Sequence, residues 1–134
     1  MEDIKNSDLI NLIHESVNEV IMCFDQLNRA HREAFGEEMV HDIGLVSMNL
    51  KLAGYKTGQA RQKALSTADY YLQIVKSWVD DSQFIFYVDK EGSHRTALTS
   101  RRALACKAKL DELGARIGGL LDSHTVKKEV TDAK

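Results

Sequence analysis

The sequence predicts an all-α protein, an up-down-up-down antiparallel four-helix bundle. The chain contains no proline, and its apolar residues recur at spacings of three and four rather than in alternation. Its 134 residues, 43% hydrophobic and 28% charged, are enough to bury one core and have a globular composition. We therefore expect one domain at 1–125, with helices at about 7–34, 37–54, 59–87 and 99–124, and a flexible C-terminal tail at 126–134.

The first two helices are defined by their apolar seams. The first should begin at an N-cap at Asn6 or Ser7 and run to about Ala34. Phe35-Gly36 is expected to break it, and Glu37-Glu38 places negative charge at the start of the second helix, as the helix dipole favours. The predicted seam residues are Leu9, Ile13, Val17, Val20, Phe24 and Leu27, then Met39, Ile43, Val46 and Leu50.

The third helix has two apolar rows. The seam residues are Leu65, Ala68, Leu72, Val75 and Val79, and a second row holds Tyr71, Ile74, Trp78 and Ile85. Together they cover about half of the circumference, more than the roughly 100° stripe of a helix that packs on one side. The additional apolar residues could be buried either in a four-helix core or in a subunit interface. Because aromatic residues are favoured at interfaces, we predict an oligomer interface at Tyr71, Ile74 and Trp78.

The fourth helix, after a polar turn at 89–93 and a cap at Thr99 or Ser100, presents three surfaces. Its seam consists of Ala103, Cys106, Leu110, Leu113, Ile117 and Leu120. Arg102, Lys109 and Arg116 recur every seven residues and form a basic stripe beside that seam. A third face of small residues would let another helix approach closely, and we assign it to the oligomer interface: Ala108, Ala115 and Gly119.

The termini and cysteines indicate the compartment. The N-terminus is polar and acidic, and no apolar run approaches membrane-spanning length. Cys23 and Cys106 lie on predicted seams, so we expect small buried hydrophobic residues rather than a disulfide. We predict a cytoplasmic protein with no membrane partner.

Charge is distributed unevenly along the chain. Residues 1–50 contain ten acidic and three basic residues, a net of −7, whereas residues 51–134 contain fifteen basic and ten acidic residues, a net of +5. The basic half can bind a polyanion, or it can pair with the acidic first helix. The candidate residues for binding nucleic acid or a polymerase are Lys51, Lys56, Arg61, Lys63, Arg101, Arg102, Lys107, Lys109 and Arg116.

No pattern supports catalysis. No serine has a histidine and an acid at a recognisable spacing, and no glycine-rich loop joins a strand to a helix. Glu38–His41 and Glu91–His94 match the Glu-x-x-His spacing of di-metal bundles, but the first opens a helix and the second lies in a turn. We therefore expect no enzyme, metal or cofactor, and a di-metal carboxylate bundle is the weakest of the interpretations.

Several motifs in the last two-thirds of the chain carry a family resemblance. They are Leu52-Ala-Gly54, the segment from Ala68-Asp to Trp78, Leu98-Thr, and Leu110-Asp-Glu-Leu-Gly-Ala-Arg-Ile-Gly-Gly-Leu120. In this order they resemble the accessory variability determinant (Avd) proteins of diversity-generating retroelements, which are grouped with the four-helix-bundle proteins of 23S ribosomal RNA intervening sequences.

The resemblance implies a barrel-like homopentamer that binds RNA or cDNA and the element's reverse transcriptase, without catalytic activity of its own. By motif position, Arg116 matches the family's basic residue, and Trp78 and Gly118 match its packing residues. The sequence pI near 6.2 departs from the strongly basic character typical of Avd proteins. The alternative is a structural or protein-interaction bundle of the intervening-sequence type that does not bind nucleic acid.

Overall fold

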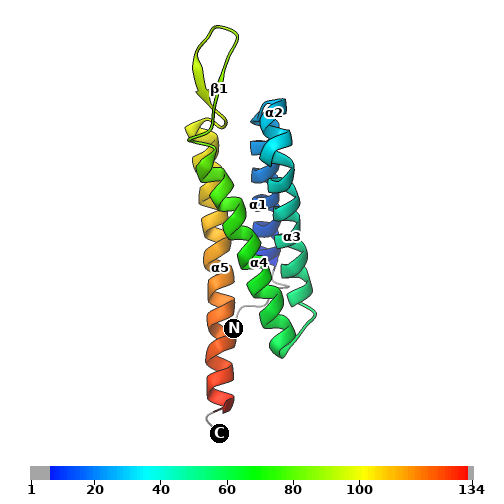
Figure 1. Cartoon of the computed structure of the whole chain (residues 1–134). Coiled ribbons are helices and arrows are strands. Elements are labelled where there is room, and N and C mark those ends of the chain that lie inside the picture. The colour runs from blue at the N-terminus through cyan, green and yellow to red at the C-terminus, as the bar shows by residue number, and fades with distance from the viewer. Residues whose placement is uncertain (1–6, 133–134) are drawn as a thin grey trace.

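The chain forms an antiparallel four-helix bundle in a computed structural model that describes the backbone of residues 7–132 and the side chains of residues 7–123 (Figure 1). The long helices are α1 (Ser7–Gln26), α3 (Glu37–Ala53), α4 (Gly58–Asp81) and α5 (Ser100–Asp132). This confirms the predicted all-α bundle, whereas its barrel-like pentameric assembly stays a prediction. Within the described part of the chain, we find no helix with the length and apolarity needed to cross a membrane.

The core lies between the four helices, where the sequence pattern placed it. The predicted seam residues are buried, except that Val17 and Phe24 are half-buried at its margin. The largest side chains with no more than 1% exposure include Leu9, Met39, Leu50, Leu72 and Leu113, so each helix contributes to one continuous core. Spacings of three and four put these residues on one side of each helix, which explains why periodicity alone located them.

The first connection differs from the prediction. Helix α1 ends at Gln26 rather than near residue 34, and the chain reverses at Leu27-Asn28. The side chain of Asn28 accepts a hydrogen bond from the backbone N–H of His31 at 2.9 Å and caps the short helix α2 (Arg29–His31). The π-helical segment η1 (Arg32–Gly36) then leads directly into α3. The helix break that was predicted at Phe35-Gly36 is therefore wrong, because these two residues are themselves helical.

Gly36 has a packing role in this segment. A Cβ atom there would lie 2.9 Å from Cδ1 of Leu27 and 3.0 Å from Cδ2 of Phe24. The absence of a side chain therefore allows η1 to pack directly against the end of α1.

The second difference is a β-hairpin. Helix α4 ends at Asp81 rather than at residue 87, and strands β1 (Phe86–Val88) and β2 (His94–Thr96) follow. They pair in antiparallel register, with Phe86 opposite Thr96 and Val88 opposite His94. The hairpin projects beyond the end of the bundle that holds α2 (Figure 1).

The hairpin turn is held by one carboxylate. Asp89 accepts hydrogen bonds from the backbone N–H groups of Glu91 and Ser93 and from the guanidinium of Arg95, the last at 2.6 Å. These bonds, above all the one from Arg95, lower the pKa of Asp89. Gly92 takes the left-handed conformation that the turn requires, with φ of 83°.

Helix α5 starts as predicted but is longer. Thr99 accepts a hydrogen bond from the backbone N–H of Arg102 at 3.2 Å, which confirms it as the cap. The helix continues to Asp132, so the expected end near residue 124 is wrong and most of the predicted tail is helical; residues 133–134 lie outside the described residues. Figure 1 shows α5 extending past the other helices.

Candidate functional surfaces

The basic stripe of α5 lies against the acidic side of α1. Arg102 forms an ion pair with Glu19, and Lys109 forms one with Glu15 at 2.9 Å. The bond to Glu15 raises the pKa of Lys109. The third stripe residue, Arg116, is half-buried. The pairing between the basic half and the acidic first helix, which the sequence left as an alternative to polyanion binding, is therefore present at Arg102 and Lys109.

Two ion pairs join α4 to α5, one of them through the predicted residue Lys107. Lys107 pairs with Asp80 at 3.0 Å, an interaction that raises the pKa of Lys107, and Lys76 pairs with Asp111 at 2.7 Å. Both pairs are partly exposed. Lys107 is thus engaged within the chain, whereas Arg101, also predicted, is exposed.

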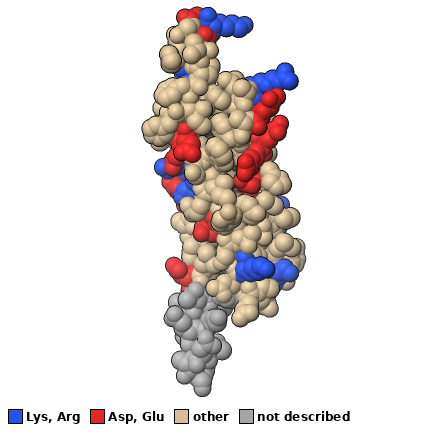
Figure 2. Space-filling model, in the orientation of Figure 1, with Lys and Arg blue, Asp and Glu red and all other residues tan. Residues whose placement is uncertain are grey.

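The remaining predicted cations gather where α3 turns into α4. Lys51, Lys56 and Lys63 are exposed there, and within the described part of the chain none of them forms an ion pair. We call these three residues the basic end. Figure 2 shows blue side chains near this end of the bundle with no red side chains beside them. Arg61 lies next to them and donates a hydrogen bond to the carbonyl of Ala53 at 3.3 Å, which fastens the turn.

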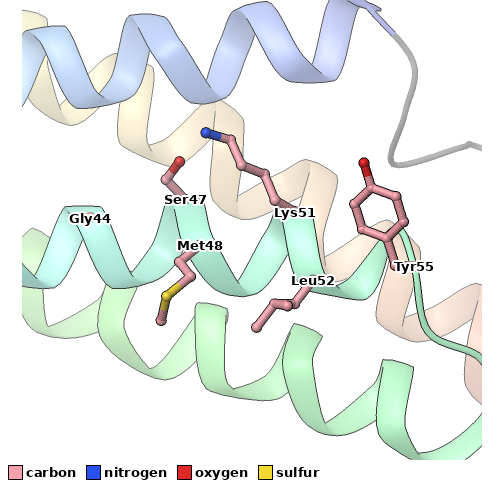
Figure 3. Close-up of a pocket in the computed structure, with 6 residues that line it drawn as sticks. All are labelled: Gly44, Ser47, Met48, Lys51, Leu52 and Tyr55. Atoms are coloured by element: carbon pink, nitrogen blue, oxygen red, sulfur yellow. The ribbon is translucent and has the colours of Figure 1, made fainter.

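An apolar groove adjoins the basic end. It has a volume of about 330 Å³ and is lined by Gly44, Ser47, Met48, Lys51, Leu52 and Tyr55. Figure 3 shows Met48 and Leu52 on the α4 side of α3, and Ser47 and Lys51 on the α1 side. Tyr55 is 80% exposed at the end of the groove, so an aromatic ring stands beside lysine side chains. The predicted site residues did not include Met48, Leu52 or Tyr55, although their spacing on one helical face was visible in the sequence.

The predicted oligomer interface divides into two parts. Tyr71, Ile74 and Trp78 are half-buried on α4, and Trp78 stacks on Phe35 with ring centroids 5.1 Å apart. Ala108, Ala115 and Gly119 are exposed on α5. In Figure 2 the face over α4 carries few charged side chains, whereas acidic side chains gather over the upper part of α3.

The glycines of α5 contact little within the chain. A Cβ atom at Gly114 would meet Leu72 at 3.5 Å, an ordinary contact, and one at Gly118 or Gly119 would meet nothing within 4 Å. Close approach of a helix at Gly118 and Gly119 therefore does not occur inside the described chain.

The hairpin presents a second surface that the sequence analysis missed. Phe86 and Val88 on β1 are 58% and 59% exposed, and Phe84, two residues before Phe86, is 78% exposed. Tyr87, which lies between Phe86 and Val88, contacts His31 edge to face, with ring centroids 5.9 Å apart. The alternation of apolar residues from Phe84 to Val88 was the available signal.

The histidine motifs do not converge. Glu38 and His41 are exposed on the first turns of α3, and Glu91 and His94 are exposed on the hairpin. Among the described residues, no three His, Cys, Asp or Glu side chains come together in a way that could hold a metal ion.

Comparison with known proteins assigns no family. No protein-family model, curated protein or solved structure matches this chain.

Proposed function

We propose that this chain is a non-enzymatic, self-associating helical bundle that binds RNA or cDNA through its basic end. Following the Avd resemblance, it would act as an accessory subunit of a diversity-generating reverse transcriptase. The observation that supports this most is that Lys51, Lys56 and Lys63 are exposed near the connection between α3 and α4, which also holds the exposed ring of Tyr55.

The chemistry of the basic end suits a single-stranded nucleic acid. Lysine ammonium groups neutralise phosphates without choosing a sequence, and an exposed aromatic ring stacks on a base. Glu15 and Glu19 on α1 engage Lys109 and Arg102 instead of these three lysines. Binding should therefore centre on the basic end, with the stripe contributing less.

Binding of single-stranded RNA to wild type and to the triple variant Lys51→Glu/Lys56→Glu/Lys63→Glu tests this proposal. Three lost phosphate contacts should reduce the slope of log affinity against log salt by about 2. The matched control is Arg29→Glu/Lys90→Glu/Arg95→Glu, which changes the net charge equally at exposed positions that are not among the predicted binding residues. Equal loss of binding in both variants would show a general charge effect and refute the basic end as the site.

Two further measurements address the polymerase partner. We expect a reverse-transcriptase gene, with paired template and variable repeats, beside the gene for this chain. We also expect the purified polymerase to bind this protein in a pull-down. A genomic neighbourhood without a reverse transcriptase would refute the retroelement assignment while leaving nucleic-acid binding intact.

The second candidate function is a protein-interaction bundle that does not bind nucleic acid. It is favoured by the two ion pairs that neutralise the stripe within the chain, Arg102–Glu19 and Lys109–Glu15. It also agrees with the small number of charged side chains on the face over α4 (Figure 2). Wild type that binds no RNA at low salt, yet still assembles, would select this candidate.

Self-association is tested separately. Light scattering at micromolar concentration should show an oligomer, and Ile74→Glu should dissociate it, because Ile74 lies half-buried in the proposed α4 interface. The control is Ile21→Glu, a comparable apolar position on α1 that is 39% exposed. A monomeric wild type would contradict the interface.

A further inference from the structure

Two cysteines from opposite parts of the sequence meet in the core. Cys23 lies near the end of α1, Cys106 lies in the second turn of α5, and both side chains are 0% exposed. Their thiols are free and hydrogen bond to each other across the contact between the two helices. The sequence analysis expected two separate buried hydrophobic residues, but the fold pairs them.

The two thiols are not equivalent. Hydrogen bonding to Cys23, together with burial, raises the pKa of Cys106. The same hydrogen bond lowers the pKa of Cys23. The Cys23 sulfur is therefore the one that more readily carries negative charge. Because the thiolate is the reactive form of cysteine, Cys23 is the nucleophile of the pair.

We propose that Cys23 and Cys106 are an oxidisable pair that hydrogen peroxide converts into an intramolecular disulfide between α1 and α5. The Cys23 thiolate attacks one peroxide oxygen and the O–O bond breaks, which leaves a sulfenic acid and hydroxide; the hydroxide takes up the proton from Cys23 and becomes water. The Cys106 sulfur then displaces the sulfenic hydroxyl group, which leaves as water with the proton from Cys106. Two thiols and one peroxide thus give one disulfide and two waters.

The position of the pair gives peroxide a route. Cys23 precedes the chain reversal at Leu27-Asn28 by one helical turn, and Cys106 follows the start of α5 by less than two turns. Helix ends open locally without global unfolding, so the thiols can be reached from this end of the bundle. The disulfide would join α1 to α5 beside the Arg102–Glu19 ion pair, at the end from which the hairpin projects.

The proposal is tested on the purified full-length chain. The reduced protein is exposed to millimolar hydrogen peroxide under native conditions, treated with catalase, denatured and alkylated. Intact mass spectrometry should show the loss of about 2 Da and no alkylation, both reversed by dithiothreitol. Peptide mapping should link the segments that contain Cys23 and Cys106. The oxidised protein should also unfold at higher urea concentration than the reduced protein, since a cross-link constrains the unfolded chain.

Single-cysteine variants provide the control. Cys106→Ala and Cys23→Ala should each show neither the 2-Da loss, about the mass of two hydrogens, nor the shift in urea midpoint. A cavity in the core can unfold the alanine variants, so Cys106→Ser is prepared as a second single-cysteine variant. The decisive measurement is made on wild type. Two alkylatable thiols after peroxide treatment of wild type would overturn the proposal, as would a disulfide that joins two chains on a non-reducing gel.

Discussion

The ion pair between Arg102 and Glu19 should contribute measurably to stability, and this prediction tests how the basic stripe is used. Each of the two side chains is only 20% exposed. A hydrogen bond to a charged group contributes about 1.5–3 kcal/mol, whereas exposed ion pairs contribute at most about 1 kcal/mol. Desolvation offsets part of this gain, because Nε of Arg102 is buried with no hydrogen-bond partner among the described residues. We therefore expect a coupling energy of about 1–2 kcal/mol.

The assay is a double-mutant cycle. Urea unfolding, followed by circular dichroism, is measured for wild type, Glu19→Gln, Arg102→Gln and the double variant, and the coupling energy is the non-additive part. The matched pair is Lys107–Asp80, whose side chains are 42% and 52% exposed. Its coupling should be smaller and should fall with added salt, whereas that of Arg102–Glu19 should persist.

A coupling below about 0.3 kcal/mol for Arg102–Glu19 would refute this reasoning, because it is the size of ordinary additivity error. It would also mean that the ion pair with Glu19 does not hold Arg102 against α1. The stripe would then be open to phosphates, and the RNA-binding experiment would need an Arg102 variant beside the basic-end variant.

Three other substitutions test particular contacts. Gly36→Ala should destabilise the fold by about 1–3 kcal/mol in urea unfolding, because its Cβ would lie 2.9 Å from Leu27; an unchanged midpoint would mean that Leu27 moves freely. Asp42→Asn should raise the melting temperature at neutral pH. Burial, then Glu38, raises the pKa of Asp42, so the native carboxylate binds protons more tightly than the unfolded one and stability falls as pH rises through that raised pKa. The stability of the Asp42→Asn variant should not decrease over this pH range. Asp89→Ala should speed amide hydrogen exchange in the hairpin and leave that of α1 unchanged. Since the pKa of Asp89 is lowered, the hairpin amides of wild type should lose the same protection, measured against the intrinsic exchange rate at each pH, as pH falls through that lowered pKa.

The core could be predicted from the sequence because its signal is repeated many times. Each helix carries four to six apolar residues at spacings of three and four, and a single exception such as Val17 does not obscure the pattern. Connections depend on single residues instead. Asn28 reverses the chain through one capping hydrogen bond, while Phe35-Gly36, which resembles a helix break, lies inside a continuous turn of π-helix.

The hairpin was missed for a related reason. Ile85 continues the apolar row of α4 and also fits the alternation from Phe84 to Val88, so the local pattern supports both a helix and a strand. Tertiary contacts decide between them. The backbone N–H of Ala97 donates to the carbonyl of Ile85 at 2.7 Å, and that of Leu98 donates to the carbonyl of Ser82 at 3.4 Å. Leu98 and Ser82 are both buried, which anchors the hairpin base against the core.

Charge clustering located the candidate cations but not their partners. Whether Arg102 faces Glu19 depends on the antiparallel alignment of α1 with α5, two helices at opposite ends of the sequence. Lys51, Lys56 and Lys63, by contrast, surround a turn between consecutive helices, so their proximity follows from the sequence. Sequence reasoning was therefore more reliable for the basic end than for the stripe.

The net charge of −2 suggests that one chain attracts a polyanion weakly, and self-association would change this by bringing the basic ends of several chains together. In a closed ring of bundles aligned with the ring axis, the same end of every subunit lies on the same rim. The basic end would then be repeated around one rim, and the hairpin, at the other end of the bundle, around the opposite rim (Figure 1). Several weak phosphate sites on one rim bind a long strand far more tightly than one site does, because each further contact is intramolecular. A mildly acidic chain can thus hold a polyanion, provided that it assembles. Ile74→Glu should consequently weaken binding of long RNA strongly and binding of short oligonucleotides little, and equal loss for both lengths would contradict the ring.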